Sequence, residues 1–346
     1  MRKGKYILII SSLLIFISII VYFILNKYIK RKSSQIPTTY LKEKTLIGYD
    51  VSDQNYFLSN PEDIVIDEDN NFYIVDSQKN CILKYDSNYK FIKEIGRTGQ
   101  GPGELLRPGD AYYRNGKLYV MDCGSFRVSI FNKDGKFLNS FPTSPIIVGQ
   151  QIAVSIDGER IYINEPTPMR KRLFTVYNEK GEILQKFGEL ELTNSGMNVF
   201  SNNEVRFDID RRDNIYVFYC HKPEVRKYNR NGKLLFKAQL KVLEITERKR
   251  ILKNDNKADR ANYVNDVCYC NNRLFLLTPL VPSLKKENIK FVMYEFDLDF
   301  NPIQRYLAKK SADIEWYCDS AVINKKREIY GVNSIGCTFS KYVIER

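Results

Sequence analysis

Six polar residues each stand about ten positions before a repeated aromatic residue, and they could do chemistry if the fold gathers them. They are Asp63, Asp110, Gln151, Arg206, Asp266 and Asp319. Carboxylate and amide oxygens are ligands of the kind that Ca²⁺ takes, and a bound ion would polarise a carbonyl or activate water. The alternative is structural: these side chains cap strand ends or pair with Arg206 and Arg107.

The aromatic residues belong to an apolar phrase that recurs six times. It reads FYIVD (72–76), LYVMD (118–122), IYINE (161–165), IYVFY (215–219), LFLLT (274–278) and IYGVN (329–333). Successive aromatics are 46, 43, 54, 59 and 55 residues apart. A period near 50 residues with β-rich units is typical of a β-propeller.

Each unit contains more than this phrase. A second strand ends in an aromatic followed by Asp or Asn, and three units continue into an Asn-x-x-Gly turn at 132–135, 178–181 and 229–232. Asn at the first position and Gly at the fourth suit a type I turn with a left-handed residue. With one strand before the phrase and one after the turn, each unit has four strands. The sequence therefore predicts an all-β, six-bladed propeller of four-stranded antiparallel blades, preceded by one N-terminal transmembrane helix.

The predicted domains are an anchor with basic flanks (1–32), a linker (33–44) and the propeller (45–346). The blades are placed near 59–96, 97–143, 146–190, 200–240, 263–308 and 314–346. The last unit has too few residues after its phrase for all of its strands, so the apolar segment 45–51 is expected to complete it and to close the ring. Residues 241–262, which are charged and rich in helix formers, and the loop 279–289 interrupt the repeat. Both are expected on the face from which propeller binding loops emerge.

Residues 6–25 carry no charge and are long enough to cross a bilayer as a helix. Basic residues lie on both sides of this stretch, so charge alone does not set its orientation. The stretch ends in Asn26 and Lys27 without small residues at a cleavage site, which favours an uncleaved signal anchor.

Composition argues against several functions. Seven of the 54 lysines and arginines and none of the 41 acids lie in residues 1–32, so the rest of the chain carries +6 and no nucleic-acid partner is predicted. The single histidine, His221, has no nucleophile-elbow motif beside it and excludes a multi-histidine metal site. The glycines at 96–103 lack the phosphate-loop pattern. Seven scattered cysteines do not form a disulfide framework, although one bridge between blades stays open.

The stretch 95–141 resembles an NHL-type repeat, with its glycine-rich loop GQGPGE (99–104) followed by the LYVMD strand and two strands ending in aromatics. The resemblance extends over about residues 45–346 and is strongest in the first two units. It implies kinship with uncharacterised six-bladed bacterial propellers that are exported or membrane-anchored. The propeller would then lie outside the cytoplasm, on the periplasmic side of a bacterial envelope. Gluconolactonase-like propellers hold a metal at the channel mouth, but their ligand set is not recognisable here.

In a propeller the six positions converge on one mouth of the central channel. We predict a membrane-anchored binding or scaffold module that holds a protein or glycan partner through channel-mouth loops, with no catalytic residue and no cofactor. Its candidate ligand-binding residues, called the channel-mouth residues below, are Asp63, Arg107, Asp110, Gln151, Arg206, Asp266 and Asp319. The alternative is a Ca²⁺-assisted hydrolase or lactonase of gluconolactonase-like type, with the ion held by Asp63, Asp110, Asp266 and Asp319.

Overall fold

The computed structural model describes residues 18, 19, 21, 36–48, 57–145, 150–166, 172–191, 202–254, 262–285, 287–309 and 318–345. The chain divides into a short unit, Met1–Thr38, and a large one, Thr39–Arg346. All elements discussed below belong to the large unit, apart from the first residue of strand β1.

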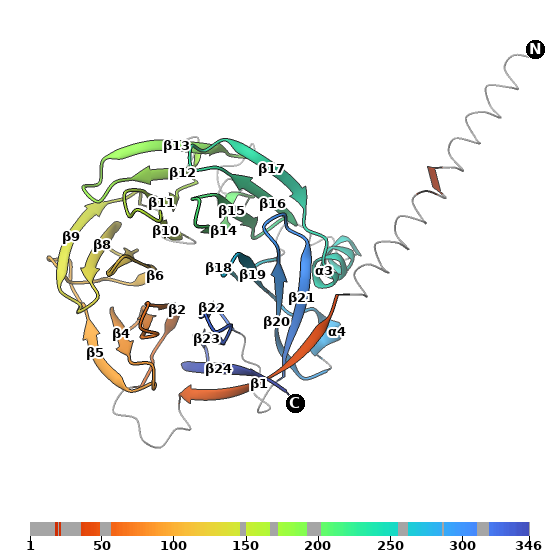
Figure 1. Ribbon diagram of the computed structural model, residues 1–346, viewed down its shortest axis with the longest axis horizontal. Helices are drawn as coiled ribbons and strands as arrows, with labels where there is room; N and C mark the ends of the chain where they lie inside the picture. Colours follow the sequence, from red (N-terminus) through yellow and green to blue (C-terminus); the bar gives the residue numbers. More distant parts are fainter. Residues whose placement is uncertain are drawn as a thin grey trace, which may run out of the picture. The chain divides into compact units, whose positions relative to one another are not determined.

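Four antiparallel four-stranded sheets are arranged around a common centre (Figure 1). The first contains β2 (Pro61–Ile66), β3 (Phe72–Asp76), β4 (Cys81–Tyr85) and β5 (Phe91–Ile95); the second, β6 (Pro108–Arg114), β7 (Lys117–Asp122), β8 (Arg127–Asn132) and β9 (Phe137–Pro142). The third contains β10 (Ile152–Val154), β11 (Ile161–Asn164), β12 (Arg172–Tyr177) and β13 (Ile183–Glu189); the fourth, β14 (Val205–Ile209), β15 (Ile215–Tyr219), β16 (Glu224–Tyr228) and β17 (Leu234–Gln239). Within each sheet the strands follow chain order from the centre outward.

The prediction of six separate blades is wrong, because only four stand as separate four-stranded sheets. The other eight strands form one continuous sheet in the order β18-β19-β20-β21-β1-β24-β23-β22. Their bounds are β18 (Asp266–Cys270), β19 (Arg273–Thr278), β20 (Ile289–Phe296), β21 (Pro302–Lys309), β1 (Thr38–Ile47), β24 (Thr338–Ile344), β23 (Ile329–Asn333) and β22 (Ser320–Ile323). The cause is β1, a ten-residue strand that is hydrogen-bonded to β24 on one side and to β21 on the other. A strand shared in this way joins what the repeat counts as two units.

The membrane-spanning helix of the predicted fold is also not found. No helix in the described part of the chain combines the length and the apolar character needed to cross a bilayer. Of the predicted span, residues 6–25, only Ser18, Ile19 and Val21 are among the described residues.

The repeated aromatic residues form the centre of the core. Tyr73, Tyr162 and Tyr216 are 0% exposed, and the phrase strands β3, β11 and β15 are buried along their whole length. Each phrase strand lies second in its sheet and packs against the neighbouring sheet; for example, Met121 of β7 packs in one cluster with Ile152 of β10. The repeat therefore predicts the core because both faces of these strands are covered. All seven cysteines are free thiols.

The Asn-x-x-Gly turns bring neighbouring sheets into close contact. In the turn at 178–181, Asn178 Oδ1 accepts hydrogen bonds from the Lys180 and Glu182 amides, and Gly181 has a left-handed backbone (φ 82°). A Cβ added to Gly181 would lie 2.5 Å from Cβ of Phe141, which belongs to the outermost strand of the preceding sheet. Gly135 and Gly232 face the outer strands of their own preceding sheets in the same way. Glycine is thus required both by the turn and by the contact.

We expect Gly232→Ala to lower the free energy of unfolding by about 2–4 kcal/mol. Its φ is 71°, and an added Cβ would lie 2.6 Å from Cβ and Cγ of Phe187. Gly116→Ala is a matched control, because Gly116 has φ 76° but nothing within 4 Å of an added Cβ. Urea unfolding of both variants separates backbone strain, on the order of 1 kcal/mol, from the steric contact. Equal losses in the two variants would contradict the contact.

Two helices lie in the predicted interruptions of the repeat. Helix α3 (Leu243–Asn254) falls in 241–262, and the short helix α4 (Pro282–Lys285) falls in 279–289. Val242, directly before α3, and Ile245 on the helix are buried. Buried Glu244 accepts hydrogen bonds from Tyr294 and Arg305 and so ties α3 to the eight-stranded sheet. This attachment fixes the helix against β20 and β21.

Candidate functional site

Six strands surround the centre: β2, β6, β10 and β14, which begin the four blades, and β18 and β22, the two ends of the eight-stranded sheet. They pack side by side in the cyclic order β2-β6-β10-β14-β18-β22 (Figure 1). Five of the six positions that sequence analysis selected are equivalent in register. Each pairs with the residue two after the repeated aromatic, as in Asp63 with Val75 and Asp266 with Leu277.

At each of the first three inner strands, a side chain on the strand or directly before it accepts a hydrogen bond from a backbone amide of the next strand. Asp63 Oδ2 accepts from Ala111 N at 3.0 Å. Asp110 Oδ2 accepts from Ile152 N at 2.7 Å, and Gln151 Oε1 accepts from Phe207 N at 2.9 Å. In each pair the donor is the residue that follows the equivalent position on the next strand.

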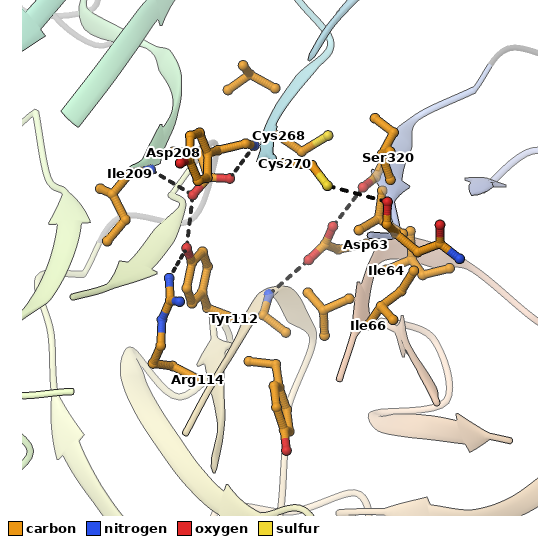
Figure 2. A pocket seen from close by; sticks show the side chains of 18 of the residues that line it. Asp63, Ile64, Ile66, Tyr112, Arg114, Asp208, Ile209, Cys268, Cys270 and Ser320 are labelled. Carbon is orange, nitrogen blue, oxygen red and sulfur yellow. Dashed lines mark hydrogen bonds between the residues drawn. The ribbon is translucent and has the colours of Figure 1, made fainter. Parts of the chain in front are cut away.

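The other three inner strands continue the series and close it. Asp208 Oδ2 accepts from Tyr269 N at 2.7 Å, and Asp266 Oδ2 accepts from Ala321 N at 3.0 Å. Ser320 Oγ then donates to Asp63 Oδ1 at 2.7 Å and lies 3.0 Å from Asp266 Oδ2 (Figure 2). The six side chains Asp63, Asp110, Gln151, Asp208, Asp266 and Ser320 are called the inner ring below. Five of them accept a hydrogen bond from an amide of a strand with which they share no ladder hydrogen bonds, and Ser320 closes the ring through its hydroxyl.

The inner ring departs from the sequence prediction at two strands. On β14 the equivalent position is Arg206, which has no acceptor atom in its side chain. Asp208, two residues further along the same face, accepts instead. Its donor is Tyr269, two residues beyond Val267, the residue that follows the equivalent position Asp266. On β22 the ring residue is Ser320. Asp319, one position earlier, belongs to the opposite side of the strand, where its carboxylate accepts from the Ser334 amide and hydroxyl.

Burial disfavours the ionised form of two ring carboxyls. Burial and the nearby Asp63 raise the pKa of Asp266 to about 7, although the Ala321 amide and Arg206 act against this. Burial and Asp63 also raise the pKa of Asp110 well above its ordinary value. Like charges enclosed in a low-dielectric centre disfavour ionisation of both groups.

Two cavities share the inner ring as part of their lining. One, of about 450 Å³, is lined by ring residues together with Tyr112, Arg114, Cys268 and Cys270 (Figure 2). The other, of about 1090 Å³, is called the mouth cavity below. Asp63, Asp110, Gln151, Asp266 and Ser320 line both, so the ring lies between the two spaces.

All seven channel-mouth residues line the mouth cavity, as does Leu280 beside helix α4. The structure thus brings together every residue in the set, while their binding of a ligand stays a prediction. Arg206 Nε donates to the Asn265 carbonyl at 2.9 Å and its guanidinium lies 3.6 Å from Glu204. Arg107 is exposed; its backbone is left-handed (φ 51°) and its amide donates to Asn80 Oδ1 at 2.7 Å.

Among the other residues that line this cavity, sequence reasoning singled out neither Arg248 nor Gln150. Arg248 comes from α3, and Gln150 directly precedes Gln151. Both amide atoms of Gln150 are buried without a hydrogen-bond partner among the described residues. No repeat position marks Arg248, and its place depends on how α3 packs, so single-sequence periodicity held no signal for it.

His221 lies close to this cavity through its partner. Its Nε2 is 2.9 Å from Glu204 Oε2, and Glu204 lines the mouth cavity. The hydrogen bond from His221 outweighs burial and lowers the pKa of Glu204. The lone histidine is therefore a half-buried partner of a carboxylate that also faces Arg206.

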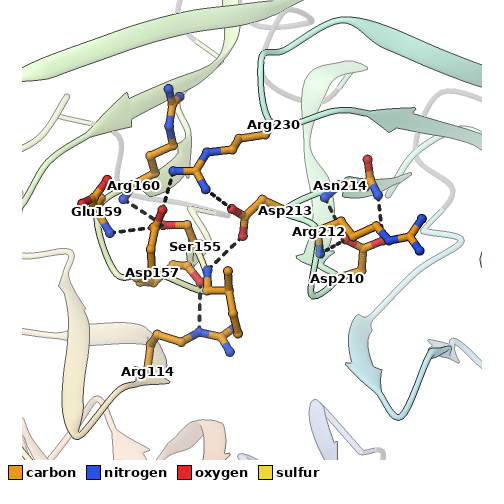
Figure 3. A network of polar contacts seen from close by, with 12 residues as sticks. Arg114, Ser155, Asp157, Glu159, Arg160, Asp210, Arg212, Asp213, Asn214 and Arg230 are labelled. Carbon is orange, nitrogen blue, oxygen red and sulfur yellow. Dashed lines mark hydrogen bonds and ion pairs between the residues drawn. The ribbon is translucent and has the colours of Figure 1, made fainter.

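A network of ion pairs and hydrogen bonds lies among the turns next to the 450 Å³ cavity (Figure 3). Arg230 donates to Asp213 at 2.7 Å and to Asp157 at 2.5 Å, so it links the turns of two neighbouring sheets. Burial raises the pKa of Asp157, but the hydrogen bonds from Ser155 and Glu159 and the Arg230 guanidinium together lower it to about 2. These charges are paired within the fold.

No group of three or more His, Cys, Asp and Glu side chains in the described ranges is arranged to hold a metal ion. The hydrogen bonds of the four predicted Ca²⁺ ligands explain why they do not form such a group. Asp63, Asp110 and Asp266 turn oxygens toward backbone amides, and Asp319 turns its carboxylate toward Ser334. The capping role that the sequence offered as the alternative accounts for these contacts.

No family profile matches the chain. Over 150 residues it is 26% identical to the protein brain tumor of Drosophila melanogaster, a match that covers 42% of this chain and 13% of that protein's length. Its structural neighbours are bacterial β-propeller proteins. A putative exported protein of Bacteroides fragilis is 13% identical with a TM-score of 0.52, covering 89% of this chain and 100% of that one.

Two further neighbours are a DUF4221 member from Bacteroides vulgatus and the virginiamycin B lyase of Staphylococcus aureus. The first is 12% identical with a TM-score of 0.54, covering 88% of this chain and 99% of that one. The second is 10% identical with a TM-score of 0.51, covering 88% and 99%. At such identities the likeness shows the fold alone. The chain thus has a propeller fold like that of exported proteins and lyases, and its closer kinship with NHL repeats is not confirmed.

Proposed function

We propose that this chain is a binding module outside the cytoplasm that holds part of a partner protein or glycan in the mouth cavity. The observation that carries the proposal is the cavity itself, about 1090 Å³ in volume and lined by all seven channel-mouth residues. A concave site with a few convergent polar groups is the usual form of a binding site. The exported structural neighbour supports a location outside the cytoplasm.

The alternative, a Ca²⁺-assisted hydrolase or lactonase, has less support. A catalytic ion needs several free oxygen ligands, and the four carboxylates assigned to it already accept hydrogen bonds from the protein. We therefore favour binding without catalysis.

Capture by the immobilised full-length chain tests the proposal. We expect Arg107→Glu to reduce capture of the partner from envelope extracts or from a glycan array at least tenfold, because the exposed guanidinium lies in the cavity lining. Lys136→Glu is the matched control, since Lys136 is exposed and does not line the cavity. Equal capture by both variants would contradict the proposal. Ca²⁺ uptake in calorimetry that Asp110→Ala abolishes would favour the hydrolase instead.

A further inference from the structure

The lining of the mouth cavity includes cations that no described residue neutralises. Arg248 Nη2 donates to the Leu280 carbonyl at 2.6 Å, and among the described residues this guanidinium forms no ion pair with a carboxylate. Burial lowers the pKa of Arg248, which is the direction expected for a guanidinium without a neighbouring carboxylate. The exposed side chain of Arg107 likewise has no hydrogen bond or ion pair in the described part of the chain.

The acidic side chains that line the same cavity already have hydrogen-bond or ion-pair partners within the protein. Asp63, Asp110 and Asp266 belong to the inner ring, and burial favours the neutral form of the last two. Asp319 accepts from Ser334, Glu204 pairs with His221 and Arg206, and Glu62 accepts from Asn60 and Ser77. Among the described residues that line the cavity, the charges without a counterion are therefore those of two arginines, which suits a bidentate carboxylate.

Gln150 adds a second kind of contact. It is 6% exposed, it lines the cavity, and neither its Nε2 nor its Oε1 has a hydrogen-bond partner in the described part of the chain. A buried amide with a free donor and a free acceptor is costly unless something pairs with both. A peptide group, which offers one carbonyl and one N–H, matches this pair of atoms.

We infer that the mouth cavity binds an acidic peptide segment, with Arg107 and Arg248 holding carboxylates and Gln150 pairing with the peptide backbone. This inference rests on the proposed function and names the chemistry of the partner. A protein partner is favoured over a glycan because no aromatic side chain lines the cavity among the described residues. The planar ring faces that sugars and other flat ligands stack on are therefore missing from this lining.

Fluorescence anisotropy of labelled hexaglutamate with the full-length chain tests the inference. We expect saturable binding that weakens with added salt, and at least a tenfold higher Kd for Arg248→Gln and for Gln150→Leu. Arg107→Gln should have a similar effect, and because Arg107 is exposed this variant is expected to fold normally. Lys136→Gln should bind like the unchanged chain, and labelled hexalysine should not bind.

Three outcomes would overturn the inference. They are an absence of hexaglutamate binding up to millimolar concentration, binding that none of the three cavity variants weakens, and tighter binding of oligogalacturonate that the same variants weaken. The last would assign the cavity to an acidic glycan. Partner capture that depends on Arg107 together with no affinity for hexaglutamate would leave the proposed function standing while the inference fails.

Discussion

Replacing Asp208 by alanine should lower the free energy of unfolding by about 3–5 kcal/mol. Asp208 is 8% exposed and accepts hydrogen bonds from Tyr269 N at 2.7 Å, Ile209 N at 2.7 Å and Tyr112 Oη at 3.0 Å. Arg114 Nη2 donates to the same tyrosine hydroxyl at 2.9 Å. Alanine would leave two buried amides and a hydroxyl without an acceptor, and each such loss costs on the order of 1–3 kcal/mol.

Asp157→Ala is the control for this prediction. Asp157 also accepts several hydrogen bonds, including one from Arg230, but it is exposed, so water replaces the lost partners (Figure 3). We expect a loss of about 1 kcal/mol or less. Denaturant unfolding, followed by circular dichroism, measures both variants. A loss for Asp208→Ala no larger than that of the control would show that the inner ring contributes little to stability.

The second large effect is a loss of stability as the pH rises from about 4 to about 7. The folded chain raises the pKa of Asp266 to about 7 and that of Asp110 well above its ordinary value, whereas both carboxyls titrate near 3.9 when unfolded. Between these values the folded state holds more protons than the unfolded state. The free energy of unfolding therefore falls with pH, by up to about 1.4 kcal/mol per pH unit for each such carboxyl.

Urea unfolding between pH 4.5 and pH 8 measures this slope. Carboxyls with lowered pKa, such as Asp157 at about 2, act only at lower pH and do not mask it. Asp266→Asn removes one titrating group, so the variant should lose part of the slope and be destabilised less at pH 8 than at pH 5. A stability curve of Asp266→Asn that runs parallel to that of the unchanged chain would mean that Asp266 does not titrate in this range.

Sequence analysis predicted the buried core strands and most of the inner-strand positions, because both follow from the spacing of the repeated apolar phrase. The repeated phrase fixed which strands are buried, and counting back from its aromatic found five of the six equivalent positions on the inner strands. On the sixth strand Asp319 was selected, one residue before the equivalent position, Ser320, because a spacing of about ten residues from Tyr330 fits both. The alternation of side chains along a strand makes a one-residue error a change of face.

Three-dimensional pairing explains the remaining errors. Nothing in the repeat shows that β1 hydrogen-bonds to both β21 and β24, so the count of separate blades was too high. The predicted closing segment, 45–51, overlaps only the last residues of β1, and residues 49–51 lie outside the described residues. Arg248 and Gln150 reach the cavity through a helix and a loop that belong to no repeat position. Such contacts depend on packing between distant segments, which one sequence does not encode as a pattern.

The position of β1 determines when the eight-stranded sheet can be completed during synthesis. Leu41 pairs with Ile344 and Thr45 with Ser340, so this strand leaves the ribosome long before its partner β24 does. At about 5–20 residues per second, the wait is on the order of tens of seconds. Until then the amides of β1 stay available to other chains, which makes a nascent or truncated polypeptide vulnerable to swapping and aggregation.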